Sequence, residues 1–155
     1  MSGDRDTIVQ GLAELASRYG FRGFRATNYY REWPETVCLL NLQKSSWGPQ
    51  FYLNAAVWFT RLGPERRPKE YKCHIRWRIS SLMEDGQSKA FTQALDLEHS
   101  LPDEQRLSMI KNGVDAFGFQ LLSRCDSEEA ALRVADEYAP HVMVALKARK
   151  QEKVA

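Results

Sequence analysis

The amino-acid sequence predicts an α+β fold: a single antiparallel sheet of four or five strands, with an N-terminal helix and two or three C-terminal helices packed mainly on one face. Three observations predict it. Apolar residues recur at helical spacing near the start of the chain, alternate with polar residues through the middle, and return to helical spacing in the last third. A run of strands followed by helices is typical of an α+β domain. With 155 residues, the chain is expected to form a single domain over 1–155.

The first helix is expected over residues 4–19, because Ile8, Leu12 and Leu15 repeat at helical spacing and Gly20 ends the pattern. The following segment alternates and is predicted to form a strand over about 24–32. Its inward side is expected to carry Phe24, Ala26 and Tyr30. The outward side then carries Arg25, Thr27, Tyr29 and Arg31.

Two further strands, at 36–44 and 51–60, are expected to pair as a hairpin. Trp33-Pro34-Glu35 separates the pair from the first strand, because proline lacks the amide hydrogen that a central strand needs. A turn over 45–50, which contains Gly48-Pro49, connects the two strands. This turn sets the register, since side chains alternate between the faces. It places Asn41 opposite Asn54, Gln43 opposite Tyr52 and Val37 opposite Trp58.

The rest of the chain is expected to add a fourth strand at 71–80 and helices at about 102–122 and 127–150. Ser100-Leu101-Pro102 is a start signal for the first of these helices. Asp126 followed by Glu129 resembles a capping box for the second. Two points stay open: the segment 90–97 either forms a short fifth strand at the sheet edge or does not, and Pro140 either kinks the last helix or splits it.

The register sorts the predicted sheet into two unlike faces. The inner face receives the helices and collects Cys38, Leu40, Leu42, Phe51, Leu53, Ala55, Val57 and Phe59. We expect the outer face to be polar, basic and aromatic, with its candidate binding residues being Arg25, Tyr29, Asn41, Gln43, Tyr52, Asn54, Trp58, Lys72, His74, Arg76 and Arg78. Polar residues also cover the wet face of many antiparallel sheets without any function. Val37, Leu39, Ala56 and Trp58 complicate that simpler interpretation, because they suggest that a loop, a terminal helix or a second subunit covers part of the face.

Composition and motifs exclude several classes of function. The formal net charge of +2 is too small to indicate nucleic acid or membrane partners by itself. The start of the chain does not resemble a secretory signal, so we expect a cytoplasmic location. The three cysteines show no C-x-x-C spacing and are expected to be reduced thiols. The phosphate-binding loop, the dinucleotide fingerprint and the hydrolase elbow are all missing from the sequence, and the scattered histidines do not indicate a metal site, so we expect no cofactor and no metal.

The turn at 45–50 and the strands beside it carry a resemblance to a known family. The matching runs are Gly20-Phe21-Arg22 leading to Tyr30-Arg31, Asn41-Leu42-Gln43-Lys44-Ser45 with Trp47-Gly48, Phe51-Tyr52-Leu53-Asn54, and Cys73-His74-Ile75-Arg76-Trp77-Arg78. Over about residues 8–80 the chain resembles the bacterial family called domain of unknown function 4304. The resemblance supports the sheet, and implies no activity, cofactor or catalytic residue.

A binding or interaction module is the function that these patterns favour. Between residues 61 and 78, seven Lys or Arg stand against two Glu, so an acidic protein or another anionic ligand is the expected partner. A regulatory or toxin-neutralising role is one version of this hypothesis. The alternatives are a small enzyme with a polar cleft around Asn41, Asn54, His74 and Arg76, and a protein that binds single-stranded nucleic acid.

Overall fold

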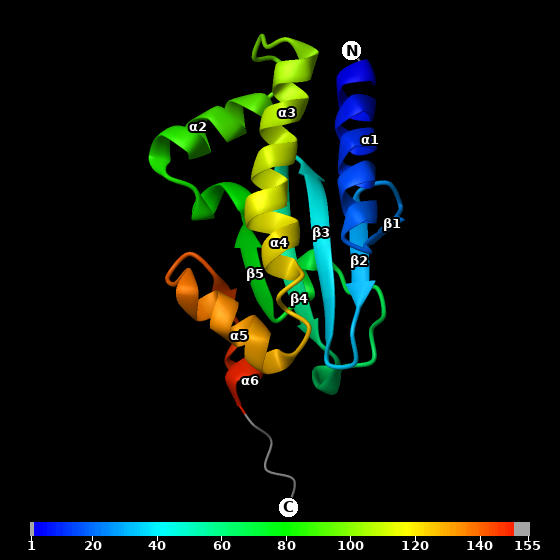
Figure 1. Ribbon diagram of the computed structural model, residues 1–155, viewed down its shortest axis with the longest axis vertical. Coiled ribbons are helices and arrows are strands. Elements are labelled where there is room, and N and C mark those ends of the chain that lie inside the picture. Colours follow the sequence, from blue (N-terminus) through cyan, green and yellow to red (C-terminus); the bar gives the residue numbers. More distant parts are fainter. Residues whose placement is uncertain (1, 151–155) are drawn as a thin grey trace, which may run out of the picture.

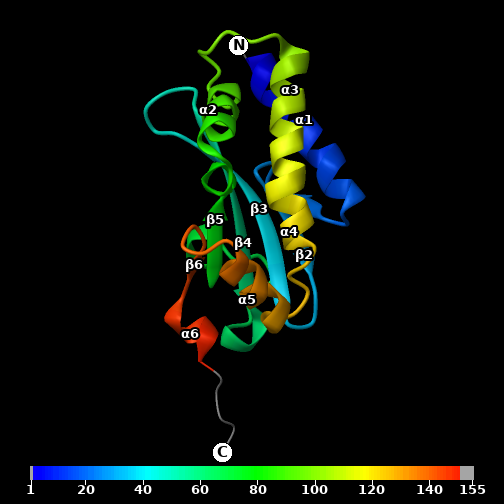
Figure 2. The same ribbon diagram turned by 60° about the vertical axis from the view of Figure 1, so that its left-hand side comes forward.

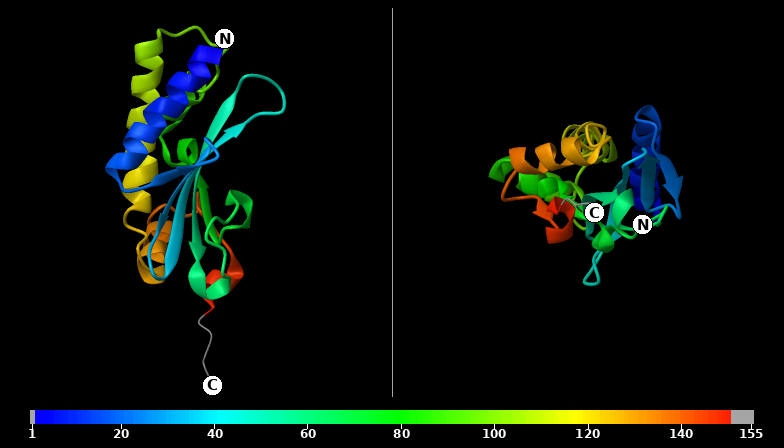
Figure 3. Two further views of the ribbon diagram at one scale, coloured as in Figure 1. Left: turned by 90° about the vertical axis from the view of Figure 1, so that its right-hand side faces the viewer. Right: turned by 90° about the horizontal axis from the view of Figure 1, so that it is seen from below.

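One antiparallel sheet forms the centre of the molecule, and helices cover one of its faces (Figures 1 and 3). The computed structural model describes residues 2–150, with side chains from residue 5 onward. The sheet follows chain order, from β1 to β6. Its strands are β1 (Arg22–Phe24), β2 (Asn28–Glu32), β3 (Thr36–Lys44), β4 (Phe51–Phe59), β5 (Ile75–Arg78) and β6 (Met143–Val144). The predicted α+β class is confirmed, with six strands in place of four or five.

The helices lie at both ends of the chain and between the last two strands. The α-helices are α1 (Ser2–Arg18), α2 (Asp85–Ala94), α3 (Asp103–Val114), α4 (Gln120–Leu122), α5 (Glu128–Glu137) and α6 (Leu146–Arg149). A π-helical turn, η4 (Asp115–Phe119), joins α3 to α4, and short 3₁₀ turns form η1 (Thr60–Leu62), η2 (Glu70–Lys72) and η3 (Ile79–Leu82). Figure 2 shows α3 and α4 running along the sheet, with α5 beside β4 and β5. The predicted helix at 102–122 is therefore one continuous helical rod.

The first helix ends as the sequence predicts. Ile8, Leu12 and Leu15 are buried against the sheet. Gly20 has φ of +77°, and the amide of Phe21 donates to Ala16 O at 2.9 Å. This is the Schellman arrangement, in which a glycine takes the left-handed conformation that other residues avoid.

The hairpin of β3 and β4 has the predicted register. Asn41 lies opposite Asn54, Gln43 opposite Tyr52, and Val37 opposite Trp58. All eight residues expected on the inner face are buried. They join the helices in one continuous apolar core, the main core. Figures 2 and 3 show the tip of this hairpin projecting away from the helices.

The predicted strand at 24–32 is wrong in two respects. It is a hairpin of two short strands, because Arg25 and Ala26 have φ of 55° and 61° and turn the chain. The faces are also exchanged. Tyr29 pairs with Leu40 on the helix side, where it is 3% exposed and its hydroxyl donates to Val9 O, whereas Tyr30 lies on the outer face.

The structure answers one question that the sequence left open and corrects one further expectation. The segment 90–97 is no strand, because Phe91, Ala94 and Leu95 share the helical spacing that buries one side of α2 and its C-terminal turn. The predicted strand at 71–80 is shorter than expected and runs over Ile75–Arg78.

Pro140 splits the predicted helix at 127–150, since α5 ends at Glu137 and the chain then forms β6 against β5 and the short helix α6. Ser127 caps α5 by accepting from the amide of Ala130 at 3.1 Å, in place of the expected Asp126.

Part of the outer face is covered by the loop of residues 60–73, called here the covering loop. Beneath it lies a second apolar cluster, the outer cluster: Tyr30, Val37, Leu39, Ala56, Trp58 and Cys73. The Trp58 indole donates to Gly63 O at 3.1 Å and the Tyr30 hydroxyl donates to Pro68 O at 2.8 Å, so both polar groups are satisfied by the loop. The sequence suggested that a loop, a terminal helix or a second subunit covers part of this face, and the structure shows the loop.

Candidate functional site

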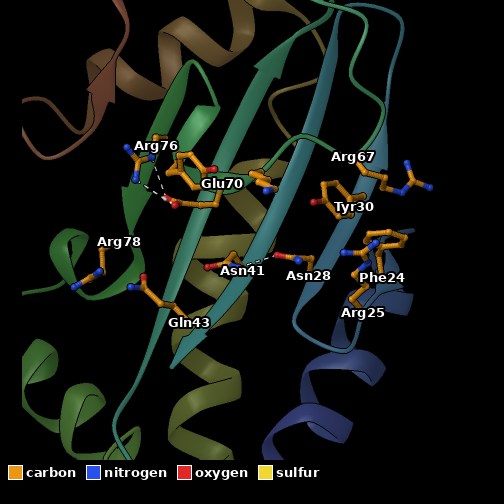
Figure 4. A pocket seen from close by; sticks show the side chains of 12 residues that line it. Phe24, Arg25, Asn28, Tyr30, Asn41, Gln43, Arg67, Glu70, Arg76 and Arg78 are labelled. Atoms are coloured by element: carbon orange, nitrogen blue, oxygen red, sulfur yellow. Dashed lines mark hydrogen bonds and ion pairs between the residues drawn. The ribbon is translucent and has the colours of Figure 1, made fainter. Parts of the chain in front are cut away.

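A hollow of about 760 Å³ lies on the outer face, where the covering loop ends and the sheet is open (Figure 4). We call it the basic hollow. It is lined by Phe24, Arg25, Asn28, Tyr30, Asn41, Gln43, Arg67, Lys69, Glu70, Tyr71, Arg76 and Arg78. Five of these side chains are cationic and one is a carboxylate, so the lining has a formal excess of four positive charges. This local excess is larger than that of the whole chain.

The floor of the basic hollow is a network of amides from three neighbouring strands. Asn41 Nδ2 donates to Asn28 Oδ1 at 2.8 Å, across β3 and β2. Asn54 Nδ2 on β4 donates to Asn41 Oδ1 at 3.2 Å and to Gln43 Oε1 at 3.0 Å. Asn54 is 4% exposed, so it is the buried member of this network. The two central amides of the hairpin, Asn41 and Asn54, are thus held by each other.

One side of the basic hollow is formed by β5. Arg78 Nε donates to Asn54 Oδ1 at 3.2 Å, and the Arg78 guanidinium lies 4.3 Å from the centroid of the Tyr52 ring. Arg76 forms a two-pronged ion pair with Glu70, at 3.0 Å from Nε and 3.2 Å from Nη2. Glu70 comes from the covering loop, so the loop and β5 are joined at the wall of the hollow.

The opposite side is formed by the β1–β2 hairpin and the covering loop. Figure 4 shows Phe24, Arg25, Tyr30 and Arg67 on this side, away from Arg76 and Arg78. The Arg25 guanidinium lies 5.1 Å from the Phe24 ring, and that of Arg67 lies 5.2 Å from the Tyr30 ring. Arg67 also pairs with Glu32 at 2.9 Å. Aromatic rings therefore position both cations of this side.

The structure brings together some of the predicted binding residues and separates others. Those that line the basic hollow are Arg25, Asn41, Gln43, Arg76 and Arg78, with Asn54 and Tyr52 in contact with them. Tyr29 is in the main core, Trp58 is in the outer cluster, and Lys72 is exposed on η2 outside the lining.

His74 also lies outside the basic hollow, and it is 1% exposed. Its Nδ1 accepts from the amide of Phe59 at 2.9 Å, and its ring lies 4.3 Å from that of Trp58. Burial, with smaller contributions from the charges of Lys147 and Arg61, lowers the pKa of His74 to about 4. The four residues of the predicted catalytic cleft therefore do not converge, because His74 is enclosed elsewhere.

Several lining residues were not among those predicted from the sequence. They are Phe24, Asn28, Tyr30, Arg67, Lys69, Glu70 and Tyr71. The charge excess between residues 61 and 78 pointed to the loop that supplies Arg67 and Lys69. Asn28 was missed because the strand that carries it was placed with its faces exchanged.

The turn that carries the strongest part of the family resemblance lies apart from the basic hollow. Trp47 is 96% exposed at the tip of the β3–β4 hairpin. The Ser45 hydroxyl accepts from the Trp47 amide at 3.1 Å, and the Ser45 amide donates to Gln50 O. Ser45 therefore has a geometric role in the turn.

Over residues 2–150, no group of three or more His, Cys, Asp and Glu side chains could hold a metal ion. The three cysteines, Cys38, Cys73 and Cys125, are buried and form no disulfide. Burial raises the pKa of the Cys73 thiol to about 12. None of the described helices is both long and apolar enough to cross a membrane. The cytoplasmic location stays a prediction from the sequence.

A comparison with family models finds one match. The model described as Domain of unknown function (DUF4304) matches residues 12–124, from α1 to just past α4. This range includes every residue that lines the basic hollow. No curated protein and no solved structure matches the chain.

Proposed function

Because the chain belongs to the DUF4304 family, whose description names no function, we propose a function from the basic hollow itself: the protein is a binding module that holds an anionic ligand there. The observation that carries this proposal is the clustering of Arg25, Arg67, Lys69, Arg76 and Arg78 around one concave surface. Like charges that are brought together repel one another, so an arrangement of this kind is most stable when an anion is bound.

The shape of the basic hollow, in addition to its charge, supports the binding of a ligand. Ligand sites are typically concave, with volumes of roughly 300–1,000 Å³ and a few polar groups at fixed positions. The basic hollow has about this volume, and its amides are held in place by hydrogen bonds between strands. Ordered amides and guanidinium groups bind carboxylate or phosphate without a large cost in side-chain entropy.

The test uses two of the cations that form no ion pair with another described residue, Arg25 and Lys69. In the double variant Arg25→Asn/Lys69→Gln, the asparagine tolerates the left-handed backbone at position 25. Isothermal titration calorimetry with inorganic pyrophosphate and with citrate is expected to show affinity reduced by about tenfold or more, since each charge-assisted hydrogen bond contributes about 1.5–3 kcal/mol.

The matched control is Lys89→Gln/Arg133→Gln, which removes the same two charges from exposed positions on α2 and α5. This control is expected to bind both anions with nearly the affinity of the unmodified protein. The lower net charge reduces the affinity only slightly, because salt screens distant charges. Equal losses in the two double variants would mean that only net charge matters. The proposal also fails if the unmodified protein binds neither anion.

A further inference from the structure

The amide network of the floor has a direction, and Arg78 sets it. A guanidinium can only donate hydrogen bonds, so the atom of Asn54 that meets Arg78 Nε must be the oxygen. The Asn54 nitrogen then faces Asn41 and Gln43, and both of its hydrogens are used there. Arg78 therefore determines which way each amide of the network is turned.

The same direction continues to the ends of the network. Asn41 accepts at Oδ1 and so donates from Nδ2 to Asn28 Oδ1. The nitrogen atoms of Asn28 and Gln43 remain, and no described residue accepts a hydrogen bond from either. The network thus ends in two NH₂ groups at the lining of the basic hollow. An oxygen-rich ligand would find unused donors on the floor and cations around it.

Four of the five cations that line the hollow are placed at two opposite ends of this floor. Arg25 and Arg67 lie beside β2, whereas Arg76 and Arg78 lie on β5 (Figure 4). Three strand spacings separate β2 from β5 in the sheet, which is about 14 Å at roughly 4.8 Å per strand. Arginine side chains that lean inward shorten this span, and the amides of β3 occupy the space between the two groups.

We propose that the ligand of the basic hollow is a small molecule with an oxyanion at each end and hydrogen-bond acceptors between them. The two anionic groups contact the arginines of the two ends, and the middle of the ligand accepts from Asn28 and Gln43. The oxyanions are carboxylates or phosphates, because both accept from guanidinium in the same two-pronged manner. This inference rests on the proposed function and adds the shape and charge distribution of the ligand.

The experiment measures affinities for a homologous series of dicarboxylates, from succinate to suberate, and for bisphosphonates of the same chain lengths. Each is compared with the monocarboxylate or monophosphonate of its length. At the best length, the two-ended compound is expected to bind at least about tenfold more tightly than its one-ended partner, because a second charge-assisted contact forms within one complex. The two series distinguish carboxylate from phosphate as the natural group.

Variants at each end then test the geometry. Arg25→Asn and Arg76→Gln are each expected to reduce the preference for two-ended compounds to about twofold, since either variant leaves one cationic end weakened. Arg25 forms no ion pair with another described residue, so the Arg25 variant keeps the test valid even if Arg76→Gln disturbs Glu70. Arg133→Gln is the control and is expected to retain the full preference.

Equal affinity for one-ended and two-ended compounds at every length would overturn the inference. An unchanged preference in both end variants would overturn it as well. If pyrophosphate and citrate bind in the hollow while neither series shows a preference, the proposed function stands and only the two-ended ligand is excluded. Tighter binding of hexaglutamate than of any small dianion would exclude it in favour of an acidic peptide.

Discussion

Leu39 and Leu40 are neighbours on β3, both are fully buried, and they face opposite sides of the sheet. Leu40 belongs to the main core, which the helices cover. Leu39 belongs to the outer cluster, which a single loop covers. The difference shows how the basic hollow arises. The covering loop buries only part of the outer face, and the hollow lies at its edge, where Arg67, Lys69 and Glu70 of the loop meet the open strands.

The largest effect is expected from truncating these two leucines. Leu40→Ala should lower the free energy of unfolding by about 4 kcal/mol, because a helix-covered core closes poorly around a cavity. Leu40 lies under the π-helical turn, where a side chain at Gly118 would meet it. Leu39→Ala should cost about 2 kcal/mol, because a loop can move into the vacated space. Urea unfolding of the two variants measures the difference.

Equal losses would mean that the covering loop is as rigidly packed as the helices. The ligand measurements then separate the two regions further. Leu39→Ala is expected to weaken pyrophosphate binding, since movement of the loop displaces Arg67 and Lys69, whereas Leu40→Ala is expected to leave it unchanged in the fraction that is folded. The opposite pattern would contradict the placement of the site on the outer face.

The β3–β4 hairpin could be predicted from the sequence in detail. Gly48-Pro49 marks a short turn, and a short turn ties the parity of one strand to that of the other, so Asn41 had to meet Asn54 once the turn was placed. The inner face followed from the same parity. Most of the floor of the basic hollow was therefore visible in the sequence, since Asn41, Gln43 and Asn54 belong to these two strands.

The remaining parts depend on interactions that alternation does not reveal. Arg25 and Ala26 take positive φ values, which their residue types do not indicate, and the resulting turn exchanged the faces assigned to Tyr29 and Tyr30. His74 precedes β5 and is buried by Trp58 and the amide of Phe59. Because histidine is a polar residue, the sequence did not indicate this burial. Tertiary contacts of this kind override local patterns.

Acidification provides the second test, through His74 at the edge of the outer cluster. The pKa of His74 is lowered from 6.5 to about 4 chiefly by burial, so the unfolded state binds a proton more readily than the folded state. This contribution to stability is fully present above pH 6.5 and is lost as the pH falls from 6.5 to about 4. The expected loss is about 3 kcal/mol, from roughly 1.4 kcal/mol for each unit of pKa.

His74→Asn is the control for this loss, because the asparagine oxygen can accept from the Phe59 amide in place of Nδ1 and does not titrate in this range. Urea unfolding of both proteins across this pH range separates the histidine from the carboxylates, which titrate in both. Parallel stability curves would show that His74 is protonated in the folded protein without penalty, and that the ring is less enclosed than its contacts indicate.

The smallest effect concerns Glu70, the one carboxylate among the described residues that line the basic hollow. It occupies Nε and Nη2 of Arg76, the donors that a bound anion would use, and therefore competes with the ligand. Glu70→Gln is expected to tighten pyrophosphate binding by about fivefold, beyond the change seen in Glu65→Gln, which removes a charge from the same loop outside the hollow. Weaker binding in Glu70→Gln would instead mean that the ion pair holds Arg76 in its binding position. Glu70 of the covering loop would then help the anion to bind, whereas we expect Glu70 to compete with it.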